Sequence, residues 1–293
     1  MATISTIKPD GTGDFTTLAA WEDASDDASS ADQHAECYGG AGSEYGTESI
    51  GSVVLNGWSA TPNSSDYPRI YAAPGESPVI RGALGISIES YLKFTRIEGI
   101  KIIANSALNP AIKLSSSGSS NGCRVERTKI SGNFNSGIFI GNTASEDATF
   151  YVVNNLIEIN KVVTSDPAGI TVFFSGSSGT VNPFVYNNTI FCHSNSTLTN
   201  SGVTFFTTNS AMSLTVENNI CLGGTHHTGF EQLSYHSGTK TFNNNISSDA
   251  SADDFGGSNH QISVIASNVF THINDVGDIN SPDSDFSLSA TSL

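Results

Sequence analysis

The sequence predicts an all-β protein, namely a single-stranded, right-handed parallel β-helix (a solenoid) with a short N-terminal capping helix. Three observations lead to this prediction. One short phrase recurs along the chain, a second phrase recurs at nearly the same spacing, and both consist mainly of residues that favour strands.

The first phrase recurs between residues 150 and 248 and has Asn as its third residue in every copy. These asparagines are at positions 155, 188, 218 and 244, in steps of 33, 30 and 26 residues. Self-similarity at a period of roughly 20 to 50 residues is the signature of stacked repeats. The four copies are Val153-Asn154-Asn155-Leu156-Ile157, Tyr186-Asn187-Asn188-Thr189-Ile190, Val216-Glu217-Asn218-Asn219-Ile220 and Phe242-Asn243-Asn244-Asn245-Ile246.

The second phrase is a glycine followed by apolar residues at alternate positions. It begins at Gly137, Gly169, Gly202 and Gly229, in steps of 32, 33 and 27 residues. The repeated units are rich in Val, Ile, Phe and Thr and poor in Ala, Leu, Lys and Glu, which excludes helical repeats. We therefore expect coils of two or three strands each, in which every strand pairs in parallel with the coil below.

The recurring asparagine has a structural explanation. Its amide carries two donors and an acceptor, it tolerates a left-handed backbone at a sharp corner, and it can bond the same amide one coil away. We expect a structural Asn ladder, formed by Asn155, Asn188, Asn218 and Asn244, and not a binding row.

The N-terminal segment predicts a short amphipathic helix. Thr16 or Thr17 is a suitable N-cap, and the apolar residues that follow lie at three-residue spacing on one face. The first coil of a solenoid exposes an apolar cross-section and unpaired strand edges, so a helix here predicts an end cap. The expected buried face consists of Phe15, Leu18, Trp21 and Ala24.

These features together resemble a known group of proteins. The opening Asp10-Gly11-Thr12-Gly13-Asp14-Phe15-Thr16-Thr17, then an amphipathic cap, then Asn-rich coils, is similar to the pectin-lyase-like right-handed parallel β-helix superfamily. The resemblance covers residues 8–24 for the opening and about 50–250 for the coils. It implies the fold. It does not imply one activity, since the superfamily includes polysaccharide lyases, polygalacturonases, pectin methylesterases and the tailspikes and fibres of bacteriophages.

The chain divides into three predicted segments. Residues 1–50 form an N-terminal cap and lead-in, residues 51–250 form the coils, and residues 251–293 form a closing segment. The ends are acidic, with charges of −9, −1 and −6 along the three segments that sum to −16. A surface of this sign does not pair with phosphates, so we expect no nucleic-acid partner.

The sequence predicts neither a metal site nor a cofactor. The four cysteines, Cys37, Cys123, Cys192 and Cys221, lack C-x-x-C spacing and are expected to be buried free thiols. The repeats align Cys192 with Leu222 and Cys221 with Phe191. Adjacent positions on a strand point to opposite faces, so no disulfide between these two cysteines is expected.

No catalytic phrase of the resembled superfamily is present. The Gln-Asp-Thr, Gly-His-Gly and Arg-Ile-Lys phrases are absent, and the Asp-Asp pairs lie near the two ends of the chain. A site assembled between coils remains open, because neighbouring coils are about 30 residues apart in sequence. The candidate residues for such a site are Glu146, Asp147, Glu158, Asp166, Glu217 and Glu231, with His193, His226, His227 and His236.

Paired phenylalanines predict an exposed apolar stripe. Side chains alternate along a strand, so Phe173-Phe174 and Phe205-Phe206 each place one ring inside and the next outside. With Phe174 and Phe206 outward and one coil apart, the stripe is available for subunit packing or glycan contact, or for cover by a loop.

Two main functional hypotheses follow. The first is a structural protein of a bacteriophage virion (tailspike, fibre or head-surface protein) that forms a homo-oligomer, with a trimer as one option. Its expected partners are other virion proteins, with a host polysaccharide as a further option. The second is a polysaccharide lyase or glycoside hydrolase with an intercoil site, and a bacterial surface adhesin is a third option. No signal peptide and no apolar run long enough to span a membrane is visible, so the expected location is a virion or an extracellular space.

Overall fold

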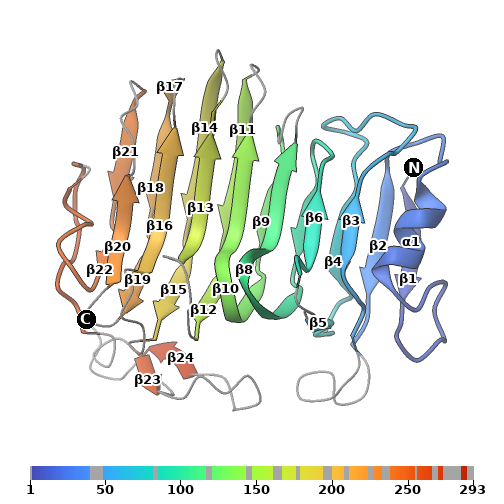
Figure 1. The fold of residues 1–293 in the computed structure, drawn as a ribbon, viewed down its shortest axis with the longest axis horizontal. Coiled ribbons are helices and arrows are strands. Elements are labelled where there is room, and N and C mark those ends of the chain that lie inside the picture. Colours follow the sequence, from blue (N-terminus) through green and yellow to red (C-terminus); the bar gives the residue numbers. More distant parts are fainter. Residues whose placement is uncertain are drawn as a thin grey trace.

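The structure is a computed structural model of the chain. It describes residues 2–39, 49–81, 85–116, 121–142, 147–160, 167–175, 179–193, 200–207, 211–223, 227–232, 238–254, 256–265, 270–272 and 285–288. The chain winds into a parallel β-solenoid of about 6 turns with very little helix, which confirms the predicted fold class (Figure 1).

Apart from the first turn, which holds helix α1, the described coils contribute strands to two large sheets. The ten-stranded sheet forms one side, which we name face A, and its strands pair in the order β1-β2-β4-β7-β9-β11-β14-β18-β21, with β17 beside β14. All these pairs are parallel. The strands are β1 (Thr3–Ile7), β2 (Gln33–Cys37), β4 (Arg69–Ala72), β7 (Arg96–Glu98), β9 (Arg124–Glu126), β11 (Ala148–Val153), β14 (Thr180–Tyr186), β17 (Ala211–Met212), β18 (Leu214–Glu217) and β21 (Lys240–Asn243).

The twelve-stranded sheet bends to form the other two sides of the coil. Two of its strands, β8 (Lys101–Ser116) and β10 (Lys129–Asn142), run through the bend, and later coils divide into a short strand and a longer one. Face B contains the first halves of β8 and β10 together with β5 (Val79–Arg81), β12 (Leu156–Ile159), β15 (Thr189–Cys192), β19 (Ile220–Gly223) and β22 (Ile246–Ser247). Face C contains the second halves together with β3 (Val53–Leu55), β6 (Ile88–Ser90), β13 (Ala168–Phe174), β16 (Asn200–Thr207) and β20 (His227–Gln232).

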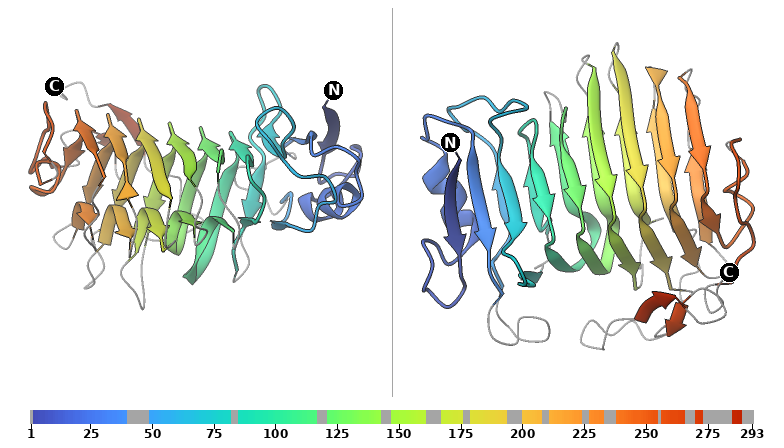
Figure 2. Two further views of the ribbon diagram at one scale, coloured as in Figure 1. Left: turned by 90° about the horizontal axis from the view of Figure 1, so that it is seen from above. Right: turned by 180° about the vertical axis from the view of Figure 1, so that it is seen from behind.

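The strands of successive coils lie side by side along the long axis of the molecule (Figure 2). Strands in a sheet are spaced by about 4.8 Å, so equivalent side chains on one face form columns at that repeat. A surface residue therefore has its spatial neighbours one coil away, about 30 residues along the chain. This arrangement decides which side chains share a site.

A helix closes the N-terminal end of the solenoid. Helix α1 (Leu18–Ser25) begins after Thr17, which has an extended backbone and whose hydroxyl accepts a hydrogen bond from the N–H of Ala20 at 3.2 Å, as expected of an N-cap. Its buried side chains are those of Leu18, Trp21, Glu22 and Ser25. Ala24, which three-residue spacing placed on the buried face, is exposed, because the face follows the 3.6-residue period of the helix.

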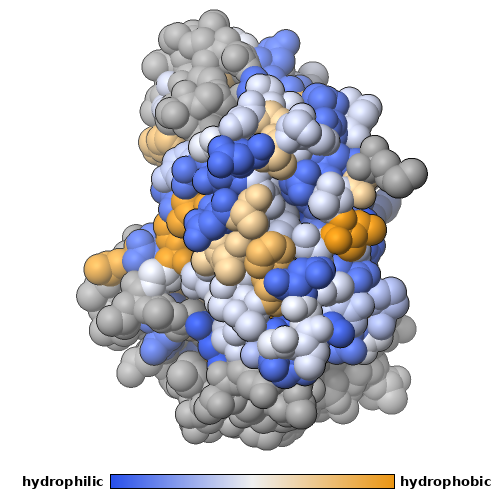
Figure 3. All heavy atoms as spheres, turned by 90° about the vertical axis from the view of Figure 1, so that its right-hand side faces the viewer, coloured by the Kyte–Doolittle hydropathy of each residue, from blue (hydrophilic) through white to orange (hydrophobic). Residues whose placement is uncertain are grey.

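The residues before the helix cover part of the free edge of face A. The carboxylate of Asp14 accepts hydrogen bonds from the backbone N–H of Thr6 at 2.8 Å and from its hydroxyl at 2.9 Å. The backbone N–H of Phe15 then donates to the carbonyl of Thr6. An unpaired edge strand is a template for aggregation, so this contact protects part of β1. Viewed from this end, the surface is mostly hydrophilic with small apolar patches (Figure 3).

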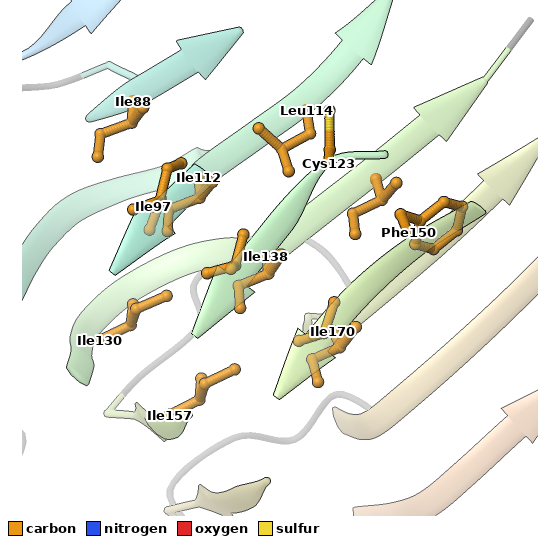
Figure 4. Close-up of a cluster of buried hydrophobic side chains, with 14 of the residues drawn as sticks. Ile88, Ile97, Ile112, Leu114, Cys123, Ile130, Ile138, Phe150, Ile157 and Ile170 are labelled. Atoms are coloured by element: carbon orange, nitrogen blue, oxygen red, sulfur yellow. The ribbon is translucent and has the colours of Figure 1, made fainter. Parts of the chain in front are cut away.

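The interior is a continuous column of branched aliphatic side chains. Isoleucines from all three faces point into it, and many of them are fully buried (Figure 4). Phenylalanines replace them in several coils, including Phe134, Phe150, Phe174, Phe205 and Phe242. Stacked coils thus bury a core that no single coil could close alone.

The glycine of the second phrase marks a close approach between faces B and C. A Cβ atom at Gly137 would lie 2.7 Å from Cγ2 of Ile157, and one at Gly169 would lie 2.5 Å from Cγ2 of Ile190. The contact repeats at Gly202, where a Cβ atom would lie 2.6 Å from Cβ of Cys221. Glycine recurs here because the strand of face C passes directly over a side chain of face B.

The Asn ladder lies at the corner between faces A and B. Asn155 donates its side-chain amide to Oδ1 of Asn188 at 3.0 Å, Asn188 donates to Asn219 at 3.0 Å, and Asn219 donates to Asn245 at 3.1 Å. Each amide also donates to a backbone carbonyl of the preceding coil. All four side chains are buried. The ladder therefore satisfies polar groups within the core.

The predicted ladder requires a shift of one residue in its last two coils. Asn218 and Asn244 lie one position earlier, in an exposed column with left-handed backbone, with φ of 57° and 54°. The amide of Asn244 does donate to Oδ1 of Asn218 at 3.1 Å, so these two bond each other outside the core. Their place in the buried ladder belongs to Asn219 and Asn245. Earlier members of the outer column are Gly99, Arg127, Asn154 and Asn187.

An irregular segment covers the last complete coil. Residues 257–264 add backbone hydrogen bonds to β21 and β22, and His260 follows a left-handed Asn259, as each ladder asparagine follows its corner residue. Nδ1 of His260 accepts the N–H of Asn245 at 3.2 Å, so this histidine ends the ladder. Two antiparallel strands, β23 (Phe270–His272) and β24 (Asp285–Leu288), follow. Among the residues described, no helix has the length and hydropathy needed to cross a membrane.

Candidate functional site

The outer surface of face C carries three stacked aromatic rings, which we name the aromatic platform: Phe139, Phe173 and Phe206. The rings of Phe173 and Phe206 have centroids 5.0 Å apart and planes 5° apart. The ring of Phe139 stacks on Phe173 at 6.2 Å and 24°. All three side chains are partly exposed. The rings therefore stack face to face along the long axis and turn their edges towards the outside.

The prediction of an exposed stripe formed by Phe174 and Phe206 was half wrong. Phe206 points outward as expected, but Phe174 is fully buried in the core, and Phe173 takes the outward position. The register of the strands pairs Phe173 with Phe206 and Phe174 with Thr207. The glycine phrase contains the signal for this pairing, because Phe173 and Phe206 both lie four residues after their glycine, at Gly169 and Gly202. Phe139 was missed because it lies in the neighbouring column, paired with Thr171.

A hydrogen-bonded carboxylate lies toward the C-terminal side of the platform. Oε2 of Glu231 accepts a hydrogen bond from the hydroxyl of Ser201 at 2.6 Å and from that of Thr204 at 3.5 Å. The register places Glu231 directly beside Thr204, which lies between it and Thr171 in the same outward column. These bonds hold the carboxylate on face C next to the rings.

A cation and a second carboxylate lie toward the N-terminal side. Nζ of Lys113 pairs with Oε1 of Glu89 at 2.6 Å, and the hydroxyl of Tyr91 donates to the same oxygen at 2.6 Å. Burial alone would lower the pKa of Lys113, but the hydrogen bond and charge of Glu89 outweigh it, so this pKa is raised. The hydrogen bond to Glu89 likewise raises the pKa of Tyr91. Lys113 lies directly beside Phe139 in register.

The two carboxylates of this column are too far apart to act as a pair. Glu89 and Glu231 are separated by five strand steps, through Lys113, Phe139, Thr171 and Thr204. Five steps of about 4.8 Å give about 24 Å. Glycoside hydrolysis needs two carboxyl groups about 5 to 9.5 Å apart. Glu89 and Glu231 therefore do not form a glycosidase dyad.

The other candidate acids lie on different parts of the coil. Glu217 is on face A, where Oε1 accepts a hydrogen bond from the amide of Asn243 at 2.9 Å. Asp147 lies just before β11 and accepts the N–H of Thr180 at 2.6 Å. Glu158 is on face B. Glu146, Asp166, His226 and His236 lie outside the described residues.

Glu158 and His193 form a buried pair. Oε1 of Glu158 lies 2.8 Å from Nε2 of His193, and the two side chains are 6% and 3% exposed. The ring of Phe191 meets that of His193 edge to face at 4.8 Å. Both residues were candidates for an intercoil site in the sequence analysis, and the register of adjacent coils brings them together. Their burial limits contact with a large substrate.

His227 and the cysteines are also buried. Burial lowers the pKa of His227 to about 4, against the opposing influence of Asp249. Burial raises the pKa of the Cys123 thiol to about 12. All four cysteines are free. The strand register pairs Cys221 with Ile190 and Cys192 with Gly223, one residue away from the predicted alignment.

No cluster of three or more histidine, cysteine, aspartate or glutamate side chains suited to a metal ion occurs within the described ranges. No protein-family model matches the chain, and comparisons with curated proteins and with solved structures found no match. The geometry of the aromatic platform is therefore the strongest indication of function.

Proposed function

We propose that this protein is a structural component of a bacteriophage virion, a tailspike, fibre or head-surface protein. It acts as a rigid β-helical rod and contacts glycan of the host surface through the aromatic platform. The observation that carries the proposal is the stack of Phe139, Phe173 and Phe206 along the axis of the rod.

The chemistry of the platform fits a sugar chain. Sugar rings present C–H groups on their faces and hydroxyls on their edges, so they pack on aromatic rings and bond polar groups beside them. The partly exposed edges of the stacked rings provide apolar contact for the sugar C–H groups, and the carboxylates of Glu231 and Glu89 at the two ends provide the polar contacts. A parallel solenoid holds these side chains on rigid strands, which reduces the ordering cost of binding.

Assembly is part of the same proposal. The rod forms a homo-oligomer, with a trimer as one option, and it contacts other virion proteins in the virion or in an extracellular space. Exposed large apolar side chains outside the platform, among them Ile4, Val54 and Leu108, are available for such contacts.

The alternative is a polysaccharide lyase or glycoside hydrolase. One observation favours it: a carboxylate 2.8 Å from an imidazole, in Glu158 and His193, is able to move a proton. The burial of both groups and the separation of Glu89 from Glu231 weigh against it.

The test combines oligomeric state and glycan cleavage on one sample. The protein is examined by light scattering and then incubated with a panel of neutral and acidic bacterial polysaccharides. We expect a stable trimer that binds at least one polysaccharide without producing new reducing ends or unsaturated products. A monomer that releases oligosaccharides would support the enzymatic alternative.

A further inference from the structure

Face A contains a polar hollow that is separate from the aromatic platform. The hollow has a volume of about 430 Å³ and is lined by residues of β4 and β7 and of the turns that follow them. Small-molecule sites typically measure about 300 to 1,000 Å³, so this one is large enough for a small ligand. Its charged and aromatic lining consists of Arg69, Tyr71, Glu76, Glu98 and Arg127.

The hollow lies where the outer corner column lacks a side chain. The left-handed corner residues of successive coils are Gly99, Arg127, Asn154, Asn187, Asn218 and Asn244. Gly99 is the only glycine among these six, and both it and Arg127 line the hollow. On the opposite wall, a turn at Pro74 and Gly75 projects from the end of β4. The missing side chain leaves a notch with Arg127 beside it.

Ion pairs join three of the four charged groups of the hollow, Arg69, Glu98 and Arg127. Arg69 binds Glu98 with two hydrogen bonds, of 3.0 Å from Nε and 2.6 Å from Nη2. Arg127 reaches Glu98 at 3.2 Å and Glu126 at 2.8 Å. A guanidinium has five N–H donors, and the side chain of Arg127 is 59% exposed. Arg127 therefore keeps donors for a ligand.

Tyr71 contributes a fixed aromatic side to the hollow. Cζ of Arg69 lies 4.3 Å from the centre of its ring. Its hydroxyl donates to Oε1 of Glu36 at 3.2 Å. These contacts hold the ring in place before any ligand arrives.

The charge balance identifies the class of ligand. Two cations, Arg69 and Arg127, and two anions, Glu76 and Glu98, line the hollow, so neither an anion nor a cation is favoured. A sugar hydroxyl both donates and accepts hydrogen bonds, which suits alternating guanidinium and carboxylate groups. We propose that this hollow is a second glycan site that binds one neutral sugar residue, with Arg127 as its principal donor.

Two substitutions test the site with little change to the backbone. Arg127→Asn removes the guanidinium, and Gly99→Asn fills the notch. Asparagine already occupies the corner in four later coils, with the same left-handed backbone, so both changes preserve the turn. A Cβ at Gly99 would lie 3.1 Å from Cβ of Ala72, which requires a small adjustment of that neighbour.

The experiment measures binding of methyl glycosides of neutral hexoses by saturation-transfer NMR and titration. We expect the unmodified protein to bind at least one of them. Arg127→Asn is expected to weaken that binding about tenfold or more, which corresponds to the loss of a charged hydrogen bond. Gly99→Asn is expected to weaken it as much, because the new side chain occupies the space of the sugar. Circular dichroism and thermal unfolding check that each variant is folded.

A double variant of the platform, Phe173→Thr with Phe206→Thr, separates this site from the proposed function. It is expected to keep the methyl glycoside binding of the hollow while binding polysaccharide on face C roughly tenfold more weakly. No binding of any neutral glycoside by the unmodified protein would overturn the inference. Full binding by the folded Arg127 and Gly99 variants would overturn it too.

Discussion

At the scale of the residue, each corner between faces A and B uses two adjacent positions differently. The first position has left-handed backbone and is exposed, as at Asn218, and the second is buried and bonds the next coil, as at Asn219. Asparagine suits both, because it tolerates positive φ and carries donors and an acceptor. The two roles predict different effects of substitution.

Asn219→Ala is expected to lower the free energy of unfolding by about 2 kcal/mol or more. It removes the partner of the Asn188 N–H and leaves buried polar groups unsatisfied, at about 1 to 3 kcal/mol each. Asn218→Gly is the matched control, because glycine retains the left-handed backbone and no buried group loses a partner. Urea unfolding compares them, and equal stability of the two variants would contradict the ladder.

Burial of His227 predicts a dependence of stability on pH. Its pKa is about 4 in the folded protein and about 6.5 in the unfolded chain, so the unfolded chain binds more protons between these values. Stability that is present above about pH 6.5 is therefore lost as the pH falls towards 4. Between pH 7 and pH 5 we expect a loss of about 2 kcal/mol from this group.

His227→Leu isolates this contribution, because it replaces the titrating imidazole with an apolar side chain at the same buried position. Urea unfolding of both proteins at pH 7 and pH 5 gives the difference. The variant should lose about 2 kcal/mol less than the unmodified protein. An identical loss in both would show that His227 does not carry the dependence.

At the scale of the element, the glycine phrase reflects contact between faces B and C. Each glycine lets the strand of face C cross a side chain of face B, so it has a packing role. The phrase recurs in the sequence because the same packing contact between faces B and C recurs in successive coils. Insertions between elements change the number of residues from one glycine to the next, but they leave the contact between faces B and C in place.

Gly169→Ala is expected to destabilise the protein by about 1 to 3 kcal/mol, because its Cβ would overlap Ile190 at 2.5 Å and a backbone oxygen at 2.8 Å. Gly85→Ala is the matched control, since a Cβ there meets nothing within 4 Å. The control should change stability by no more than about 0.5 kcal/mol. Melting temperatures that fall equally in both variants would contradict the packing role.

The elements also show what could be predicted from the sequence. The class of fold, the capping helix and its Thr17 N-cap followed from periodicity and from turn chemistry. Side-chain direction did not, because a shift of one residue turns every side chain of a strand to the other face. Asn218 against Asn219, and Phe174 against Phe173, are two instances. Counting from the glycine places Phe173 and Phe206 in one column. The ladder asparagines are located instead by a buried residue three positions earlier, namely Val152, Val185, Val216 and Phe242.

The hollow on face A could not be predicted from the sequence, for a different reason. Arg69, Glu98 and Arg127 lie in three coils, and their ion pairs join residues 29 apart in the chain. Nothing in their local sequence indicates that they meet. Contacts of this kind depend on the exact register of coils whose lengths differ.

At the scale of the whole molecule, the solenoid places different chemistry on different sides. Face C carries the aromatic platform, and face A carries ion pairs between Arg69, Glu98, Glu126 and Arg127. The acidic segments at the two ends of the chain leave its middle nearly neutral. A rod with distinct sides can bind a glycan along one side while another side remains free for assembly.

The most direct test of the central claim is to measure, by titration, how tightly three proteins bind a bacterial polysaccharide that the unmodified chain binds. These are the unmodified chain, Phe173→Thr with Phe206→Thr, and the control Phe173→Tyr with Phe206→Tyr, which retains both rings. Loss of stacking is worth about 0.5 to 1.5 kcal/mol for each aromatic pair, so the Thr variant should bind roughly tenfold more weakly. The Tyr variant should bind as the unmodified chain does. Equal binding by the Thr variant, with its fold intact, would contradict a glycan-binding role for the platform.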